Sequence, residues 1–415
     1  MSGRIHIAFF GVRNAGKSSM INAITGQELA IVSSVPGTTT DPVYKAMELL
    51  PLGPVVLIDT PGIDDSGELG DQRVQKTYQA LNKADAAVLV ADANCKLTKA
   101  DKELIKLFEE KNIPCMIALN KSDLSLKGEG NSMGRDIQNV TPDEASHLPY
   151  IAVSALTGQG IHELKERIAA LCKSGEPQQK LVADLIAPSD FVVLVTPIDK
   201  AAPKGRLILP QQQVIRDILE ANASSIVTQG DELKNILKYL GKKPRMVIMD
   251  SQLFDKANAA TPPDIPLTSF SILMARYKGL LDDAVEGVTA IEHIKDGDQI
   301  LIAEGCTHHR QCDDIGSVKL PRWITNYIHK KPEFCFCSGG GFPSNMTNYK
   351  LIVHCGGCML NAREMQNRAQ MAKNANVPMT NYGILIAYMQ GILKRSVELF
   401  PHLHRKLEEK RLISQ

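Results

Sequence analysis

A phosphate-binding loop occupies residues Gly11–Ser18, whose sequence GVRNAGKS fits the pattern G-x-x-x-x-G-K-S. This pattern requires a strand that ends just before the first glycine and a helix that begins at the lysine. The chain supplies both, because Ile5–Phe10 predicts a strand and Lys17–Thr25 predicts the start of a helix. Backbone N–H groups of such a loop point at an anion, and the helix adds the positive end of its dipole. The loop therefore predicts a bound phosphate chain within an α/β fold.

Two side chains of this loop and a second motif predict how phosphates and Mg²⁺ are held. Lys17 reaches the β- and γ-phosphates, and the Ser18 hydroxyl binds Mg²⁺. The motif Asp59–Gly62 (DTPG) follows an apolar run, and the Asp59 carboxylate can hold Mg²⁺ through water. Gly62 can offer its N–H to the γ-phosphate. These residues predict a nucleoside triphosphate bound with magnesium.

A third motif, Asn120–Asp123 (NKSD), predicts that the base is guanine. Asp123 can accept from the guanine N1–H and exocyclic amine, which adenine cannot match. Ser154–Leu156 (SAL) then lies where a backbone N–H can meet the guanine oxygen. The three motifs in this order predict a GTPase domain. Residues expected at the nucleotide are Gly11, Ala15, Gly16, Lys17, Ser18, Ser19, Asp59, Gly62, Asn120, Lys121, Asp123, Ser154 and Ala155.

Strands and helices alternate through the first 172 residues, which predicts a mainly parallel sheet with its ligand beyond the carboxyl ends of the strands. The polar stretch Lys173–Lys180 predicts a linker, and the proline-rich stretch Asn258–Pro266 predicts a second boundary. We expect an α/β protein: a P-loop GTPase domain at residues 1–172, then two smaller α/β units at residues 181–262 and 267–415. The middle unit lacks a constellation of titratable residues, which indicates a scaffold or dimerisation module.

Charge and hydropathy argue against two classes of partner. The net charge of +1 shows no electrostatic footprint for nucleic acid, and aromatic residues make up only 5% of the chain. The N-terminus lacks a signal-peptide layout, and the apolar runs are too short to span a bilayer. We therefore expect a cytoplasmic protein whose nine cysteines are reduced, so that grouped cysteines indicate a metal site or catalysis.

Such a group lies near the C-terminus. The pentapeptide His354–Cys358 (HCGGC) follows an apolar run, and Cys306 follows another, 49 residues upstream of Cys355. Three thiolates with nearby imidazoles can bind zinc or an iron–sulfur cluster, or can stay unbound. A structural zinc site closes its fourth position firmly, whereas three possible fourth ligands occur here, which favours iron. These possible fourth ligands are His308, His354 and Asp313. Outside the pattern, Cys312, Cys335 and Cys337 are interpreted as small apolar residues.

The nucleotide motifs resemble those of the TrmE-Era-Septin class of GTPases. Residues 36–41 (PGTTTD) resemble the first switch of that class, which implies that Thr39 binds Mg²⁺ in the GTP state. The resemblance also implies that Asn14 helps to hold a K⁺ ion against the phosphates, in place of an arginine finger. Ile63 stands where Ras-like GTPases carry a water-orienting glutamine, so intrinsic hydrolysis should be slow without such help. We assign catalytic roles to Lys17, Thr39 and Asn14.

The GTPase motifs together with Cys306-x-His308 and His354-Cys355-x-x-Cys358 are similar to the FeFe-hydrogenase maturation GTPases, the HydF family. This resemblance implies a 4Fe-4S cluster held by the three cysteines, and a scaffold or carrier role for the two-iron precursor of the hydrogenase active site. It implies as partners two radical-SAM maturases, apo FeFe-hydrogenase and further copies of this chain. The alternatives are an RNA-modification or ribosome-assembly GTPase with a zinc-stabilised C-terminal domain, and a structural zinc protein whose GTPase drives dimerisation.

Overall fold

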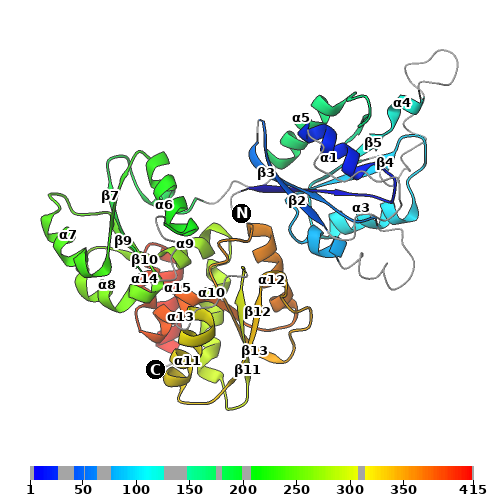
Figure 1. The fold of residues 1–415 in the computed structure, drawn as a ribbon. Coiled ribbons are helices and arrows are strands. Elements are labelled where there is room, and N and C mark those ends of the chain that lie inside the picture. The colour runs from blue at the N-terminus through cyan, green and yellow to red at the C-terminus, as the bar shows by residue number, and fades with distance from the viewer. Residues whose placement is uncertain are drawn as a thin grey trace. The chain divides into compact units, whose positions relative to one another are not determined.

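The computed structural model describes residues 4–26, 42–50, 52–62, 76–125, 147–173, 180–198, 207–306 and 314–413. Of these, residues 125, 173 and 408–413 are described by their backbone alone. The chain divides into two compact units, residues 3–177 and residues 178–415 (Figure 1). Each unit is built on mainly parallel sheet with helices between most successive strands, as the alternating sequence pattern predicts.

The first unit contains a six-stranded sheet in the order β2-β3-β1-β4-β5-β6. All its neighbouring strands run parallel except β2 and β3, which pair antiparallel. The strands are β1 (Ile5–Phe10), β2 (Val43–Leu49), β3 (Gly53–Asp59), β4 (Ala86–Asp92), β5 (Cys115–Asn120) and β6 (Tyr150–Ala152). The helices are α1 (Lys17–Thr25), α3 (Lys99–Glu110), α4 (Ser122–Ser125), α5 (Ile161–Lys173) and residues 76–81.

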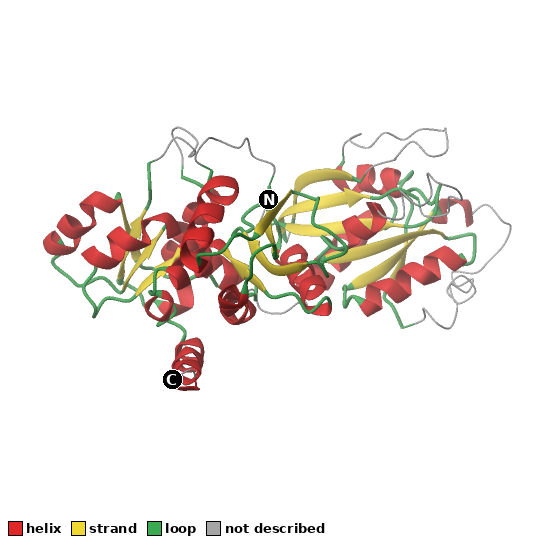
Figure 2. Cartoon of the chain, turned by 90° about the horizontal axis from the view of Figure 1, so that it is seen from below, coloured by secondary structure: helices red, strands yellow, loops and turns green. Residues whose placement is uncertain are grey.

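Helices cover both faces of this sheet, because alternate residues of each strand point to opposite sides (Figure 2). In β1, Ala8 and Phe10 pack with Phe108 of α3, while Ile7 and Phe9 pack with the side of α1 and α5. The central strands are therefore apolar along most of their length, as expected for a parallel sheet covered on both faces.

The second unit begins with a four-stranded parallel sheet in the order β10-β9-β7-β8. Its strands are β7 (Phe191–Val195), β8 (Ser224–Thr228), β9 (Met246–Met249) and β10 (Leu267–Ser269). Its helices are η3 (Ala183–Leu185), α6 (Leu209–Glu220), η4 (Gly230–Glu232), α7 (Leu233–Tyr239), η5 (Ser251–Leu253) and α8 (Phe254–Ala260).

A second four-stranded parallel sheet follows in the order β12-β11-β13-β14. Its strands are β11 (Gln299–Glu304), β12 (Glu333–Ser338), β13 (Tyr349–His354) and β14 (Met379–Asn381). The helices of this part are α9 (Phe270–Tyr277), α10 (Leu281–Gly287), η6 (Val288–His293), η7 (Ile315–Lys319), α11 (Leu320–Ile328), α12 (Ala362–Asn374), α13 (Tyr382–Met389), α14 (Leu393–Ser396) and α15 (Pro401–Ile413).

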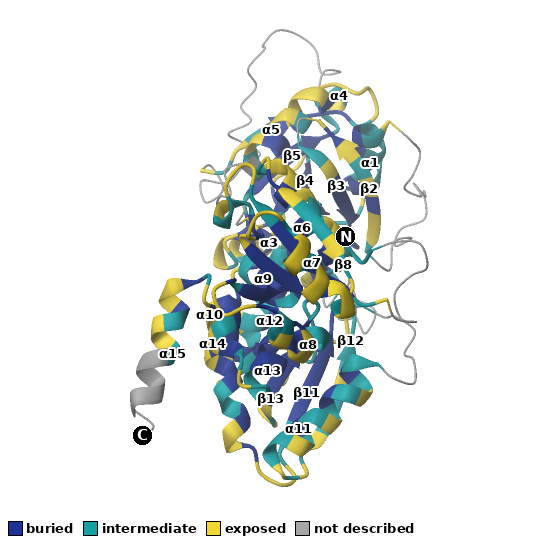
Figure 3. Ribbon diagram, turned by 90° about the vertical axis from the view of Figure 1, so that its left-hand side faces the viewer, coloured by how far each residue is buried: buried dark blue, intermediate teal, exposed yellow. Residues whose placement is uncertain are grey.

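One hydrophobic core joins the two sheets of the second unit. Val193 and Val247 of the first sheet and Ile300 and Val353 of the second belong to the same buried set, and the inner strands are buried along most of their length (Figure 3). The expected boundary at residues 263–266 falls before the last strand of the first sheet, since β10 pairs with β9. The division of the chain into three domains at the stated bounds stays a prediction.

Two helices expected to be continuous are interrupted by glycines. The apolar pattern predicts one helix over Ser269–Val285, but α9 ends before Gly279, whose φ is +71°. Ile384–Phe400 is likewise divided into α13 and α14 around Gly391, also at φ +71°. A residue in the left-handed region ends a helix, and glycine adopts that conformation without steric cost.

Among the described residues, we find no helix that combines the length and apolar character needed to cross a lipid bilayer.

Candidate nucleotide site and cysteine site

The phosphate loop requires both of its glycines. Gly11 has φ +142°, and a Cβ atom there would lie 2.2 Å from the carbonyl oxygen of Val90 in β4. Gly16 has φ +91°, and a Cβ atom would lie 2.2 Å from Nδ2 of Asn120. Any side chain at either position would therefore displace a neighbouring strand or the base-recognition motif.

Lys17 lies inside the turn of this loop. Its side chain is buried, and Nζ donates hydrogen bonds to the carbonyl oxygens of Gly11 at 2.9 Å and Val12 at 2.8 Å. These bonds hold the ammonium next to the loop's N–H groups, which is the place that Lys17 needs to reach phosphate oxygens. The predicted role of Lys17 therefore has a fitting geometry.

Ser18 and Asp59 form the expected oxygen pair for magnesium. The Ser18 hydroxyl donates to Oδ2 of Asp59 at 2.6 Å, and Asp59 is only 2% exposed. Its other oxygen, Oδ1, is buried without a hydrogen-bond partner in the part of the chain that the structure describes. Burial raises the pKa of Asp59, and the hydrogen bond from Ser18 and the charge of Lys17 oppose that shift. A buried carboxylate oxygen that lacks a donor, beside a hydroxyl, fits Mg²⁺.

Asn120 connects the base-recognition loops to the phosphate loop. Its Nδ2 donates to the carbonyl oxygen of Ala15, and its Oδ1 accepts from the N–H of Ala155, both at 3.0 Å. The Ser154 hydroxyl donates to Oδ1 of Asp123 at 2.6 Å, which orients that carboxylate. Five of the predicted nucleotide contacts thus lie together at the carboxyl edge of the sheet.

Other predicted residues of this site have different surroundings. Lys121 has φ +63°, and its ammonium lies 2.8 Å from Asp92 in β4. Asn14 is exposed, with φ +58°. Gly62 is the last residue of the segment 52–62 that the structure describes. Thr39 and Ile63 lie outside the described residues, so their predicted roles are not tested by the geometry.

The cysteines lie at the carboxyl edge of the last sheet. Cys306 comes two residues after β11, Cys355 comes directly after β13, and these strands pair in parallel with Ala303 opposite His354. The turn between Cys355 and Cys358 lies against the other loop, because a Cβ atom on Gly305 would come within 3.3 Å of Gly357 Cα. The topology therefore brings the two cysteine segments into contact.

The Cys355 sulfur is the centre of this arrangement. It accepts hydrogen bonds from the N–H groups of Gly305 at 3.1 Å and Gly357 at 3.3 Å. Such N–H groups favour a thiolate, whereas burial raises the pKa of Cys355. Burial, together with the negative charges of Cys355 and Cys358, raises the pKa of Cys306 to about 11. A cation bound among these sulfurs would reverse that repulsion.

The three sulfurs do not form a gathered ligand set. Within the described residues, no group of three or more His, Cys, Asp or Glu side chains is arranged to hold a metal ion. Two possible fourth ligands, His308 and Asp313, and also Cys312, lie outside those residues. The donor set nevertheless fits a thiolate-bound metal, because the cysteine segments are in contact and two N–H groups already point at one sulfur.

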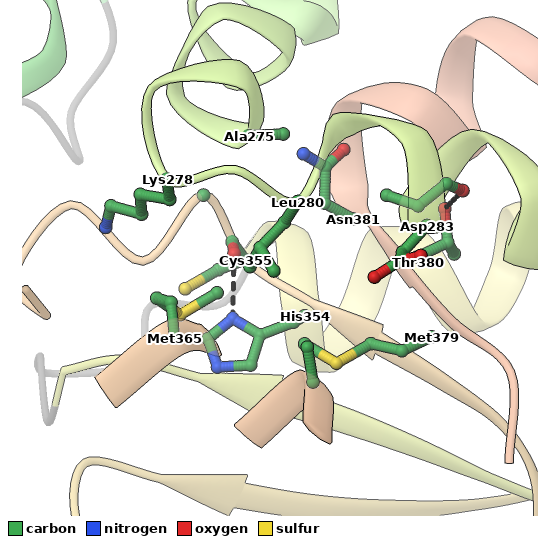
Figure 4. A pocket seen from close by; sticks show the side chains of 13 residues that line it. Ala275, Lys278, Leu280, Asp283, His354, Cys355, Met365, Met379, Thr380 and Asn381 are labelled. Atoms are coloured by element: carbon green, nitrogen blue, oxygen red, sulfur yellow. Dashed lines mark hydrogen bonds between the residues drawn. The ribbon is translucent and has the colours of Figure 1, made fainter. Parts of the chain in front are cut away.

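His354 has both ring nitrogens engaged. Arg368 Nη1 lies 3.0 Å from Nε2, and since a guanidinium can only donate, Nε2 accepts. Nδ1 therefore carries the proton and donates to the Cys355 carbonyl oxygen at 2.8 Å (Figure 4). The ring is fully buried, and burial together with the charge of Arg368 lowers the pKa of His354 to about 3. In this arrangement His354 has no nitrogen left for iron, contrary to its predicted place among possible ligands.

The sequence interpretation missed the charged residues that surround this turn. Arg368 is 3% exposed and pairs with Glu364 at 2.7 Å, one helical turn earlier in α12. Lys278 is 1% exposed and lies at the end of α9. Lys278 could have been noticed in the sequence, because a single lysine that follows a strongly apolar helix indicates a buried charge. The Glu364–Arg368 pair could not, because acid–base pairs at i, i+4 are common on exposed helices.

Fold and geometry define residues 3–177 as a GTPase domain, and residues 6–121 match the domain described as 50S ribosome-binding GTPase. Residues 181–279 match the hydrogen maturase F dimerization domain, and residues 282–399 match the hydrogen maturase F tetramerization domain. The chain belongs to the hydrogen maturase F family.

Several GTPases resemble part of this chain. The GTPase Der of Clostridium perfringens is 37% identical over 166 residues, which cover 39% of this chain and 37% of that protein. The tRNA modification GTPase MnmE of Clostridioides difficile is 29% identical over 232 residues, 56% of this chain and 46% of that protein. The chain thus spans less than half the length of these curated relatives. The structure of Aquifex aeolicus Era bound to GDP and AlF4⁻ covers 57% of this chain and 98% of its own, at 20% identity and a TM-score of 0.36.

Proposed function

We propose that this chain is a hydrogenase-maturation GTPase that holds a 4Fe-4S cluster at Cys306, Cys355 and Cys358. In this proposal the second unit serves as scaffold and carrier for the two-iron precursor of the FeFe-hydrogenase active site, which is its cargo. The supporting observation is the contact between two cysteine segments at the carboxyl edge of one parallel sheet, inside the matched tetramerization domain. Delivery is a binding function, and GTP hydrolysis is the catalysed reaction.

Each residue of the cysteine site has a distinct task. The thiolates of Cys306, Cys355 and Cys358 would hold the metal. The N–H groups of Gly305 and Gly357 orient the Cys355 sulfur. The cluster, when bound, supplies an iron whose fourth position is open to exchange. His308 and Asp313 remain the proposed fourth ligands, because both nitrogens of His354 are engaged.

The nucleotide site is proposed to act as a switch. Lys17 offsets phosphate charge, Ser18 and Thr39 bind Mg²⁺, Asn14 helps to hold K⁺, and Asp123 selects guanine. A ligand shifts a conformational equilibrium only if it binds the two states with different affinity. The switch is tested by measuring the affinity of the two radical-SAM maturases for the GTP-bound, GDP-bound and nucleotide-free chain. Equal affinity in all three states would show that the nucleotide does not control binding of the maturases.

The chain carries a dimerization domain and a tetramerization domain, which supports a homo-oligomer as its working state. Light scattering on the full chain tests this proposal directly. A mass that corresponds to a dimer or tetramer is expected, and a monomer across the whole accessible concentration range would contradict it.

The cluster is tested by anaerobic reconstitution with iron and sulfide. The full chain should be brown, with iron and acid-labile sulfide near four per chain, and the Cys306, Cys355, Cys358→Ala variant should lose both. The matched control is the Cys335, Cys337→Ala variant, which removes two cysteines of β12 in the same sheet and should keep the colour. A colourless wild-type protein with stoichiometric zinc would overturn the cluster and support a zinc-stabilised domain.

A further inference from the structure

A buried positive charge lies beneath the cysteine turn. Lys278 follows α9 and is 1% exposed, which makes it the most deeply buried of the described lysines. Its ammonium donates hydrogen bonds to the carbonyl oxygens of Gly357 and of Leu360, the latter at 3.0 Å. These two carbonyls flank Cys358, so Lys278 holds the turn from within the protein.

The geometry of Gly357 confirms how closely Lys278 lies to this turn. Gly357 has φ +61°, and a Cβ atom added there would lie 3.3 Å from Lys278 Nζ and 2.7 Å from Met365 Sδ. Because the turn needs glycine at this position, the backbone can pack directly against the ammonium. Lys278, Cys355 and His354 also line the same small cavity (Figure 4).

This charge has no carboxylate partner. Among the described residues, no acidic side chain lies within ion-pair distance of Lys278, and the nearby Glu364 is paired with Arg368. The groups that most favour its protonated form are Cys358 and then Cys355, ahead of Glu364. Burial lowers the pKa of Lys278 to about 8, so the ammonium persists at neutral pH. A buried ammonium without a carboxylate partner is costly, and negative charge on the nearby sulfurs offsets that cost.

We propose that Lys278 is the resident counter-ion of the cysteine site. Its ammonium fixes the turn through the Gly357 and Leu360 carbonyls, and it offsets the negative charge of a metal group held by thiolates. This inference rests on the proposed cluster and assigns a residue that tunes it. Adding one electron to the cluster, from a dithionite-type reductant, makes the site more negative by one charge while Lys278 keeps its proton. The ammonium therefore favours the reduced form and raises the reduction potential.

The test compares variants of the full chain after anaerobic reconstitution. Lys278→Met removes both charge and hydrogen bonds, Lys278→Gln keeps a donor without charge, and Lys278→Arg keeps the charge. The matched control is Lys330→Met, because Lys330 is also partly buried and donates to a carbonyl oxygen, that of Ile294 at 2.7 Å. Iron and sulfide content, and the midpoint potential from an electron-paramagnetic-resonance titration with dithionite, are the readouts.

The midpoint potential should shift to a more negative value in the Met and Gln variants, and should stay close to wild type in the Lys278→Arg and Lys330→Met variants. If the Met variant does not fold, the comparison of Gln with Arg still separates charge from hydrogen bonding. If the Lys278→Met and Lys278→Gln variants bind the cluster with an unchanged midpoint potential, the proposed role of Lys278 is wrong, whereas the proposed cluster still stands. A wild-type chain that binds no iron and sulfide would instead overturn the proposed function, and the inference with it.

Discussion

Arg368 donates a hydrogen bond of 3.0 Å to Nε2 of His354, and both side chains are buried. This bond fixes the proton of His354 on Nδ1, which donates in turn to the carbonyl oxygen of Cys355. Arg368 also donates to the carbonyl oxygen of Gly339 at 2.6 Å and lies 4.9 Å from the centre of the Phe342 ring. His354 is thereby a positioning residue that connects α12 to the start of the cysteine turn.

The first prediction follows from this tautomer. Replacing His354 by Asn keeps an N–H donor at about the place of Nδ1, and removes the ring nitrogen that a metal would need. We expect His354→Asn to bind as much iron and sulfide as wild type after reconstitution. Pulsed electron-paramagnetic-resonance spectra of the reduced cluster should show the same nitrogen couplings in both proteins. Loss of a strong nitrogen coupling in the variant would make His354 a ligand after all.

The second prediction concerns the buried Glu364–Arg368 pair. Arg368→Met leaves a carboxylate buried without its partner, which should lower the free energy of unfolding by about 3 kcal/mol. The double variant Arg368→Met, Glu364→Gln should recover part of this loss. Urea unfolding followed by fluorescence measures the effect, because the single tryptophan of the chain, Trp323, packs against the core of the second unit.

The matched control for this pair is Arg216 with Glu220 in α6, which has the same spacing but is exposed. Arg216→Met should change the free energy of unfolding by roughly 0.5 kcal/mol or less, since water screens an exposed pair. Equal losses in Arg368→Met and Arg216→Met would show that burial of the α12 pair does not matter.

The third prediction concerns pH. Arg276 donates to both carboxylate oxygens of Asp184, one at 2.9 Å, and this bond and charge, with a contribution from Lys180, hold the pKa of Asp184 below its usual value. A carboxyl whose pKa is lower in the folded state stabilises that state above its unfolded pKa of about 3.9, and loses this effect as pH falls through the folded pKa. Asp184→Asn should therefore cost ~0.5–1 kcal/mol at pH 7, because the pair is partly exposed.

The difference between wild type and Asp184→Asn should shrink as the pH falls from about 5 to below 4. Trp323 fluorescence during urea unfolding at a series of pH values measures it. A difference that stays constant over this range would mean that the Asp184 charge contributes nothing and that the variant acts by another route.

Local signals explain how much of this fold could be predicted. The bounds of β1 and the first residue of α1 were predicted correctly, because the phosphate loop fixes where the strand ends and the helix begins. The three-residue strands β10 and β14 were missed, because so short a run has no periodicity and exists only through pairing with β9 and β13.

The cysteine site was predictable only in part, for the same reason. Spacing identified Cys306, Cys355 and Cys358, and the strand ends place them at one edge. The surrounding charges come from distant segments: Lys278 bonds to Gly357, 79 residues away, and Arg368 bonds to Gly339. Sequence gives no sign of such long-range pairings, and it likewise could not show that His354 uses both nitrogens within the protein.

The last prediction tests the role of Asn14 in hydrolysis. Asn14 is exposed in the left-handed region at φ +58°, which glycine also adopts, so Asn14→Gly keeps the backbone conformation and removes the side chain whose oxygen would contact K⁺. Wild type should hydrolyse GTP faster in K⁺ than in Na⁺, because the cation offsets charge that develops in the transition state. The variant should lose this difference, with a loss in K⁺ on the order of 10²-fold. Asn112→Gly, at φ +50° in another loop of the same unit, is the matched control and should keep the K⁺ effect. Equal wild-type rates of GTP hydrolysis in K⁺ and Na⁺ would contradict both the proposed K⁺ activation and this role of Asn14.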